Sequence, residues 1–375
     1  MNDLLMAILS PFPASALSIS DADFLHCTEL ARKNGVEMLF YSRLKKHYAG
    51  TNACVDAYLK KNKNSYLMAV AQSMRQEAVG KDLIARLGNQ GIPVCIIKGN
   101  DIARSVYEDP NCRSSVDIDV LVKMNDFFKA DVILRDAHYS PDNQQLFGDV
   151  MYHAHHKGYY DPAYKIPVEL HWRFGVPYFF RLTPDEIWRG IVKEGDNNVR
   201  LSPEMLLIIL LIHHHYHAFR ELKILVDLLW AFYKYDASIN WHDFIDMIHK
   251  MGLTRTTMIV ISQLESLWPE KISCMKSIEL IRECFMHKGW KVSEYLVSYF
   301  SLDLERTSKM RFYMDKFVAR FALDGFNIII LSFIKTLFPP VVVIKELYHS
   351  NNNLMLTFNY VRFIYGRLKL WLGGW

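Results

Sequence analysis

The sequence lacks three features that would each assign a class of protein: paired cysteines, a surplus of one charge and a long apolar run. Its six cysteines are widely scattered, and none lies in a Cys-x-x-Cys motif. A disulfide framework and a zinc knuckle are therefore not indicated, and a reducing, cytoplasmic location is expected. The 44 basic and 40 acidic side chains leave a net charge of +4, which is too small to indicate a nucleic-acid surface.

No segment reaches the roughly 20 apolar residues that a membrane-spanning helix needs. The apolar start "MNDLLMAILSPFPASALS" has no basic leader and is interrupted by two prolines, so we expect no signal peptide. Residues 326–344 are interrupted by Lys335 and Pro339-Pro340, which predicts a core helix followed by a break; contact with a membrane surface is the alternative. The last aromatic stretch, "YVRFIYGRLKLWLGGW", is expected to pack in the core with a basic outer face; contact with a membrane surface is the alternative.

Apolar material is ample, because 51% of the 375 residues are hydrophobic and 13% are aromatic. Residues 1–90 show apolar side chains at spacings of three and four between Asp21 and Leu87, which predicts an N-terminal helical region. Ser202-Pro203-Glu204 is a helix-start signal, and residues 201–375 predict a helical C-terminal domain. No repeat or flexible linker separates these parts, so we expect them to pack into one body.

Residues 91–200 predict an α+β core with a small mixed sheet. Short apolar runs alternate there with helical patterns and turn residues. The expected elements are a strand at 94–97, a turn at Lys98-Gly99, a helix at 101–107, a strand at 116–122, a capped helix from Asn125 to Asp136, and a hairpin of 151–160 with 165–174. The predicted fold class is therefore α+β, with helical regions flanking the core on both sides.

Two aspartates interrupt the apolar strand at 116–122. Because strand side chains alternate, Asp117 and Asp119 share one face, while Ile118 and Val120 point to the other. The two carboxylates, roughly 6 to 7 Å apart along the strand, could bind hard divalent cations through oxygen. A solvated strand face, or salt bridges to Arg or Lys, is the alternative, because Asp-x-Asp is a common tripeptide.

A third carboxylate follows on another predicted strand. In "IPVELHW", Glu169 lies between apolar residues, and His171 shares its face. Three carboxylates on neighbouring strands suit a two-metal phosphoryl-transfer site, because two of them bridge the ions and the third orients the incoming hydroxyl. The sequence therefore indicates metal-dependent phosphoryl transfer.

The order of these motifs resembles one protein family. Lys-Gly, a helix, Tyr-x-Asp-Pro-x-x-Arg and "DIDVLV" are followed by "VELHW", by "LSPEMLLIILLIHHHYHAFRELKILVDL" and by "LFPP" with "LTFNYVRFIYGRL". This pattern is similar to that of the uncharacterised nucleotidyltransferase family of the DNA polymerase beta-like superfamily, and it covers most of the chain. The resemblance implies a polymerase beta-like core. It also implies transfer of a nucleoside monophosphate from a nucleoside triphosphate such as ATP to an acceptor hydroxyl, with release of pyrophosphate.

By this resemblance Asp117, Asp119 and Glu169 hold Mg²⁺ or Mn²⁺, with two ions expected, and Glu169 helps to deprotonate the acceptor. Many superfamily members carry Asp where this chain has Glu169, which leaves the ligand geometry of Glu169 open. The acceptor is a small molecule, a sugar, a protein side chain or a nucleic-acid end. The weak net charge of +4 disfavours a long polynucleotide.

The phosphates need other partners, because the usual Gly-Ser turn of the superfamily is replaced by Lys98-Gly99. Lys98 and the helix after Gly99 would hold them. The altered turn also favours a second hypothesis, a catalytically inactive nucleotide-binding or regulatory protein of the same fold. Arg113 is either a phosphate clamp or an ordinary surface salt bridge. His217 and Lys223, in the helical part, could reach toward the base or the phosphates.

The run "HHHYH" at 213–217 gives a third hypothesis, a metal-dependent phosphohydrolase. His213 and His217 are four residues apart and so share one helical face. Neither a His-Asp pair nor an HExxH motif accompanies them, so a structural or nucleotide-contacting role is favoured. His153, His155 and His156 precede Glu169, and either face of their predicted strand could border the carboxylates.

Overall fold

The computed structural model describes residues 2–12, 20–142, 154–175, 178–193, 199–304, 309–348 and 353–371. Four helices precede the sheet: α1 (Asn2–Leu9), α2 (Asp21–Lys33), α3 (Glu37–His47) and α4 (Ala53–Gly88). The side chains of Ser20 and Asn52 cap α2 and α4 by accepting hydrogen bonds from amides in the first turn of each helix. These helices lie where apolar side chains at spacings of three and four predict helix.

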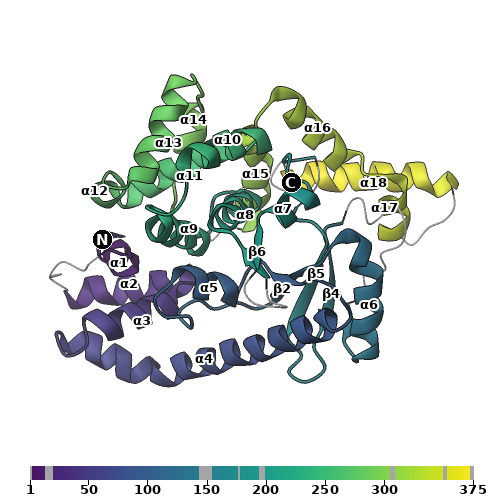
Figure 1. The fold of residues 1–375 in the computed structure, drawn as a ribbon. Coiled ribbons are helices and arrows are strands. Elements are labelled where there is room, and N and C mark those ends of the chain that lie inside the picture. Colours follow the sequence, from purple (N-terminus) through teal and green to yellow (C-terminus); the bar gives the residue numbers. More distant parts are fainter. Residues whose placement is uncertain are drawn as a thin grey trace.

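Helix α4 links these N-terminal helices to the sheet. Its 36 residues make it about 54 Å long, and it runs along one side of the molecule (Figure 1). Val55 near its start packs in one hydrophobic core, whereas Val79 and Leu83 pack against the sheet in another. Gly80 allows this close approach, because a Cβ atom there would lie 2.9 Å from Ile96 Cδ1.

The described residues form a seven-stranded mixed sheet in the order β3-β4-β5-β2-β1-β7-β6. Its strands are β1 (Cys95–Ile96), β2 (Ile118–Leu121), β3 (Ser140–Pro141), β4 (His156–Tyr160), β5 (Pro167–His171), β6 (Ile191–Lys193) and β7 (Val199–Leu201). Strands β2 and β5 are parallel neighbours near the centre. Strands β4 and β5 form the predicted antiparallel hairpin, and the mixed α+β class is confirmed.

Short helices connect these strands. They are α5 (Asn100–Val106), the 3-10 turn η1 (Met124–Asp126), α6 (Phe127–Asp136) and α7 (Pro184–Arg189). The helix predicted from Asn125 therefore begins as a 3-10 turn. Neither Lys123 nor Asp126 caps it with a side chain; instead the Asp126 amide donates to the Lys123 carbonyl oxygen and closes the first turn through the backbone.

The chain after β7 is helical, as predicted. Ser202 caps α8 by accepting a hydrogen bond from the Met205 amide, and Pro203 occupies the first turn. The helices are α8 (Pro203–Tyr216), α9 (Leu222–Tyr235), α10 (Trp241–Met251), α11 (Thr254–Leu267), α12 (Pro269–Ile272), α13 (Lys276–His287), α14 (Glu294–Tyr299), α15 (Lys309–Ala319), η3 (Arg320–Ala322), α16 (Phe326–Leu337), α17 (Val341–Leu347) and α18 (Asn353–Trp371).

The sheet has a hydrophobic core on each face. Ile118 and Val120 point to the face that packs on α4 and α6. Leu121 points to the opposite face and belongs to a continuous core that extends from Leu5 in α1 to Ile329 in α16. Because this core takes residues from all three predicted regions, they pack into one body. The predicted boundaries at residues 90 and 200 remain predictions.

The prediction that residues 326–344 begin with a core helix holds for one face only, since Ile329 in α16 is buried in the core. The helix does end before Pro339-Pro340, but Phe326 and Ile334 in α16 are 73% and 48% exposed. In α18 the outer face is both apolar and basic, because Phe358 and Tyr365, 61% and 68% exposed, share it with the exposed Arg362 and Lys369. Helical periodicity marks an apolar face but not what covers it. Of the helices in the described ranges, none has both the length and the apolar character to cross a membrane.

Candidate functional site

The Lys98-Gly99 turn follows β1 and leads into α5. Gly99 has a φ of +68°, in the region that favours glycine, and a Cβ atom there would lie 3.2 Å from Ser115 Oγ. A larger residue at this position would therefore be strained. The turn brings Lys98 onto the sheet face that carries the aspartates, where its Nζ lies 2.7 Å from Asp119 Oδ1.

The three predicted carboxylates lie together. Asp119 in β2 is paired in register with Glu169 in the parallel strand β5, and Asp117 comes just before β2 on the same face. One oxygen from each of the three carboxylates lies within 4.8 Å of the others. Asp119 is only 1% exposed. The shared face inferred from strand alternation is what brings these oxygens together.

Two side chains neutralise this group of carboxylates. Lys98 forms its ion pair with Asp119, and His171 Nε2 lies 2.9 Å from Asp119 Oδ1 and 3.1 Å from Glu169 Oε2. His156 Nε2 lies 3.6 Å from Glu169 Oε1. The alternative that the aspartates form salt bridges is therefore confirmed for Asp119, whose carboxylate pairs with Lys98. The carboxylate cluster and the ion pair are present in the same site.

Burial and charge act in opposite directions on these groups. Burial would raise the pKa of Asp119, but the Lys98 charge and the His171 hydrogen bond outweigh it and hold that pKa well below its usual range. Burial, and then the charge of Asp119, raise the pKa of Asp117. Burial would lower the pKa of His171, yet its hydrogen bonds to Asp119 and Glu169 raise it. Asp117 therefore carries the least compensated carboxylate of the two strands.

Within the described part of the chain, two groups of side chains have the spacing to hold a metal ion, and they share Glu169. One consists of Asp117, Asp119 and Glu169, and the other of His156, Glu169 and His171. Three carboxylates are the donor set that Mg²⁺ and Mn²⁺ prefer, whereas two imidazoles suit softer transition metals. The carboxylate group therefore fits the predicted ions by its chemistry.

A cavity of about 760 Å³ opens beside Asp117 and Lys98. Helices α4 and α5 and strand β7 supply much of its wall. Its charged lining residues are Lys81, Lys98, Arg104, Arg200, Lys234, Glu77, Asp101 and Asp117. Five positive and three negative side chains leave a positive surplus, which suits a polyanionic ligand such as a triphosphate.

Arg113 lies in the interior, which differs from both expectations for it, a phosphate clamp at a cleft and a surface salt bridge. It is 7% exposed, and its Nε donates to both carboxylate oxygens of Asp227 at 2.9 Å. Its Nη1 donates to the Gly99 carbonyl oxygen, and Tyr107 donates to Asp227 as well. Arg113 therefore joins α9 to the Lys98-Gly99 turn and helps to position that turn.

His217 lies at the start of the segment between α8 and α9, and Lys223 lies in α9. His217 Nδ1 is 3.5 Å from Glu221 Oε1, and its side chain is 39% exposed. The Nζ of Lys223 donates to the carbonyl oxygen of Ser114, three residues before Asp117. Burial lowers the pKa of Lys223 to about 8. The structure thus places Lys223 beside the aspartate strand, whereas His217 contacts its own helical segment.

Two further histidines of the 213–217 run, His214 and His215, pack against α11. His214 Nε2 is 2.9 Å from Gln263 Oε1, and His215 Nδ1 is 3.0 Å from Thr256 Oγ1. Burial lowers the pKa of His215 to about 3, so it is neutral. Among the described residues, neither group with metal-binding spacing includes a member of this run. The hypothesis of a phosphohydrolase built on this helix therefore loses its metal centre.

The sequence left open whether His156, or His153 and His155 on the other strand face, would border Glu169. The hairpin register pairs His156 with His171, which puts both on the Glu169 face. Counting outward from the predicted turn at 161–164 would pair position 156 with 169, two residues from the observed register, which still puts His156 on the Glu169 face. His155 also approaches, with its ring centroid 5.8 Å from that of His171. His153 lies outside the described residues.

Comparison with known proteins is informative at the family level. A family model described as "Uncharacterised nucleotidyltransferase" matches residues 20–269. The match runs from α2 to the beginning of α12 and includes the turn and all three carboxylates. Comparisons with curated proteins and with solved structures find no match.

Proposed function

The chain belongs to this nucleotidyltransferase family, and we propose that it transfers a nucleoside monophosphate from a nucleoside triphosphate to an acceptor hydroxyl. The acceptor oxygen forms a bond to the α-phosphorus, the bond from that phosphorus to the leaving oxygen breaks, and pyrophosphate departs. The observation that carries the proposal is the group of three carboxylates on two parallel strands, with oxygens within 4.8 Å of one another.

In this proposal Asp117, Asp119 and Glu169 hold Mg²⁺ or Mn²⁺, two ions being expected. Such ions supply positive charge at the phosphate oxygens and make the acceptor hydroxyl more acidic. Glu169 receives the proton of that hydroxyl, since it is the carboxylate on the neighbouring strand and is only partly buried. These roles leave the chain itself mainly with positioning and charge neutralisation.

In this proposal the partner of Lys98 depends on whether an ion is bound to the carboxylates. Its ammonium group neutralises Asp119 in the structure; if an ion took that place on the carboxylates, the ammonium group would be able to contact the triphosphate in the adjoining cavity of about 760 Å³. Gly99 lets the turn lie close to Ser115, and Arg113 Nη1 donates a hydrogen bond to the Gly99 carbonyl oxygen. Lys223 adds positive charge beside the segment that leads into β2. A long polynucleotide is not among the proposed acceptors.

The alternative of an inactive nucleotide-binding or regulatory protein is favoured by the altered Lys98-Gly99 turn and by the ion pair between Lys98 and Asp119. If that pair never opens, the carboxylates cannot all bind ions. Nucleotide binding without pyrophosphate release would favour this alternative.

Thermal unfolding with each of the four ribonucleoside triphosphates plus Mg²⁺ or Mn²⁺ tests the proposal. A ligand at about 100 times its dissociation constant stabilises the fold by about 2.7 kcal/mol. Wild type should show a metal-dependent shift for at least one nucleotide, and Asp119→Asn should not. Asp161→Asn is the matched control, because Asp161 is a buried carboxylate in the hairpin turn, outside the carboxylate group. Shifts of equal size in all three proteins would exclude the assigned site.

A further inference from the structure

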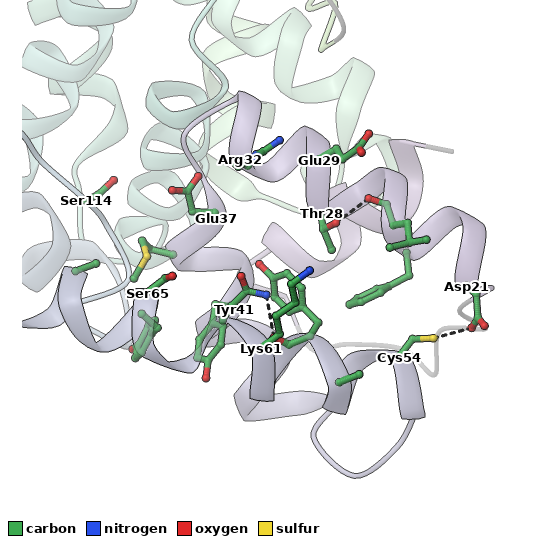
Figure 2. Close-up of a pocket in the computed structure, with 18 residues that line it drawn as sticks. Asp21, Thr28, Glu29, Arg32, Glu37, Tyr41, Cys54, Lys61, Ser65 and Ser114 are labelled. Atoms are coloured by element: carbon green, nitrogen blue, oxygen red, sulfur yellow. Dashed lines mark hydrogen bonds between the residues drawn. The ribbon is translucent and has the colours of Figure 1, made fainter.

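A second cavity lies among the N-terminal helices. It has a volume of about 670 Å³ and is lined by residues of α2, α3 and α4 together with Ser114. Figure 2 shows Ser114 and Glu37 toward one end of this cavity, and Asp21 and Cys54 at the other. Small-molecule sites in proteins have volumes of roughly 300 to 1,000 Å³, so the cavity is large enough for a ligand of ordinary size.

Aromatic rings form much of the cavity wall. Phe24 and Tyr58 meet edge to face with ring centroids 5.7 Å apart, and Tyr41 stacks on Tyr66 at 4.5 Å. Leu25, which is 66% exposed, adds to the apolar lining. Rings in these orientations offer both faces and edges to a flat apolar group.

The Ser114 end of this cavity adjoins the carboxylate site. Ser114 lines it, and Asp117 lines the cavity of about 760 Å³, so the segment 114–117 lies between the two. Lys223 donates to the Ser114 carbonyl oxygen, and it is close enough for its charge to interact with Glu37 on one side and Asp117 on the other. A molecule at the Ser114 end of the N-terminal cavity would thus be separated from the basic cavity by the segment 114–117.

The two cavities differ in charge. The charged residues of the N-terminal cavity are Arg32, Lys61, Asp21, Glu29 and Glu37, which leave one negative charge in excess, whereas the other cavity has two positive charges in excess. A triphosphate is favoured by the positive cavity and disfavoured by the negative one. The N-terminal cavity therefore suits an uncharged or cationic molecule with a flat apolar body.

We infer that the N-terminal cavity binds the acceptor, a small aromatic alcohol or phenol whose hydroxyl points past Ser114 to the carboxylates. This inference rests on the proposed function, since it supplies the second substrate of that reaction. It also narrows the acceptor to a small molecule that a cavity among three helices can enclose.

Variants that fill the cavity test this inference. Ser65 and Ala57 are exposed positions of α4 that line the cavity, so Ser65→Trp and Ala57→Trp would occupy it without disturbing the core. Asn64→Trp is the matched control, because Asn64 is an exposed neighbour on the same helix that does not line the cavity. The probe is 4-methylumbelliferone, a flat fluorescent phenol, and its binding is measured by equilibrium dialysis.

Wild type and Asn64→Trp should bind the probe. The dissociation constant of each cavity-filled variant for the probe should be higher by at least about tenfold. All four proteins should keep the same metal-dependent stabilisation by nucleotide. If wild type does not bind the probe, or the filled variants bind it equally, the acceptor assignment is overturned. If the filled variants instead lose nucleotide stabilisation, the cavity holds the nucleotide. Failure of the proposed function is seen separately, as the absence of any nucleotide shift in wild type.

The outer faces of α16 and α18 support a second, independent inference. In α18, Phe358, Val361, Tyr365 and Leu368 recur at spacings of three and four and are 40% to 68% exposed, whereas Phe363 on the other side is buried. In α16 the residues Phe326, Ile330, Ile334 and Phe338 recur every four residues and are 40% to 73% exposed. Each helix thus presents a continuous apolar stripe to solvent, which in a soluble monomer marks a contact surface.

Charge identifies the partner. Residues 326–375 contain five basic residues (Lys335, Lys345, Arg362, Arg367 and Lys369) and one acidic residue, Glu346, so they carry the whole net charge of +4. Lys335, Arg362 and Lys369 are exposed beside the apolar stripes. Helices with an apolar face bordered by Lys and Arg bind the surface of anionic bilayers. We propose that α16 and α18 dock on an anionic lipid surface.

Sedimentation with vesicles tests this second proposal. The protein should bind phosphatidylcholine vesicles that contain about 30% phosphatidylserine and should not bind phosphatidylcholine alone. Phe358→Ser with Tyr365→Ser should abolish binding, and Lys369→Gln should weaken it by about fivefold. Met68→Ser is the control, since Met68 is 74% exposed but lies on α4.

Retention of binding by the double variant would overturn the proposal. So would a concentration-dependent dimer, detected by analytical ultracentrifugation, that the double variant abolishes, because a second copy of the chain would then cover these faces.

Discussion

Replacing Lys98 by Met should make the stability of the protein depend on a divalent ion. The Lys98 Nζ lies 2.7 Å from Asp119 Oδ1, and the two side chains are 15% and 2% exposed. Breaking a buried ion pair by removing one partner costs about 3 to 5 kcal/mol, because the other charge stays buried. With an unfolding entropy of about 2.1 cal/mol/K per residue, the midpoint of this 375-residue chain should fall by about 4 to 6 °C.

Mg²⁺ or Mn²⁺ should restore much of this loss. An ion held by Asp117, Asp119 and Glu169 replaces the missing ammonium charge, and at about 100 times its dissociation constant it returns about 2.7 kcal/mol, or about 3 to 4 °C. In wild type the shift should be smaller, because Lys98 must first leave Asp119. Differential scanning fluorimetry with and without the ion measures both effects.

Lys157→Met provides the matched control. Lys157 Nζ lies 2.8 Å from Asp131 Oδ1, with side chains 6% and 14% exposed, so the same kind of pair is broken without a cluster of carboxylates. Its midpoint should fall by a similar amount and should not recover with metal. If the ion leaves the midpoint of Lys98→Met unchanged, or raises that of Lys157→Met equally, the carboxylates are not an ion site.

Three further predictions concern the surroundings of the site. Burial lowers the pKa of Lys223 to about 8 from about 10.4 in the unfolded chain. Between these pH values the unfolded chain binds more protons, so the free energy of unfolding should rise from pH 8 to 10 relative to Lys223→Met; a flat difference in urea titrations would contradict this. Asp227→Asn should cost about 3 to 5 kcal/mol in urea unfolding, because Arg113 loses its buried partner; a loss below 1 kcal/mol would mean that Arg113 is hydrated. Gly99→Ala should cost about 1 to 2 kcal/mol through its φ of +68° and the contact with Ser115; thermal unfolding at wild-type stability would show that the turn relaxes.

The sequence alone located the carboxylate face. Alternation with period two put Asp117 and Asp119 on one side of β2, and the same rule put Glu169 and His171 on one side of β5. The hairpin of β4 and β5 and the caps at Ser202 and Pro203 also followed from local patterns. These features depend on interactions between residues close in the chain, which is why a single sequence is enough to predict them.

Only the tertiary structure decided which partners these side chains meet. Arg113 and Asp227 are 114 residues apart and form a buried pair. The sequence had predicted that Arg113 is either a phosphate clamp or a surface salt bridge. Whether α16 lies in the core or at the surface was equally undetermined, because an apolar helix face looks the same in sequence whether another helix covers it or not.

The two cavities likewise exist only because α4 packs against both the N-terminal helices and one face of the sheet (Figure 1). The sequence by itself thus determined the type and spacing of the catalytic candidates. The packing of distant segments determined which charges neutralise them and what space a substrate can fill, because contact between distant segments is set by the whole fold and not by local pattern.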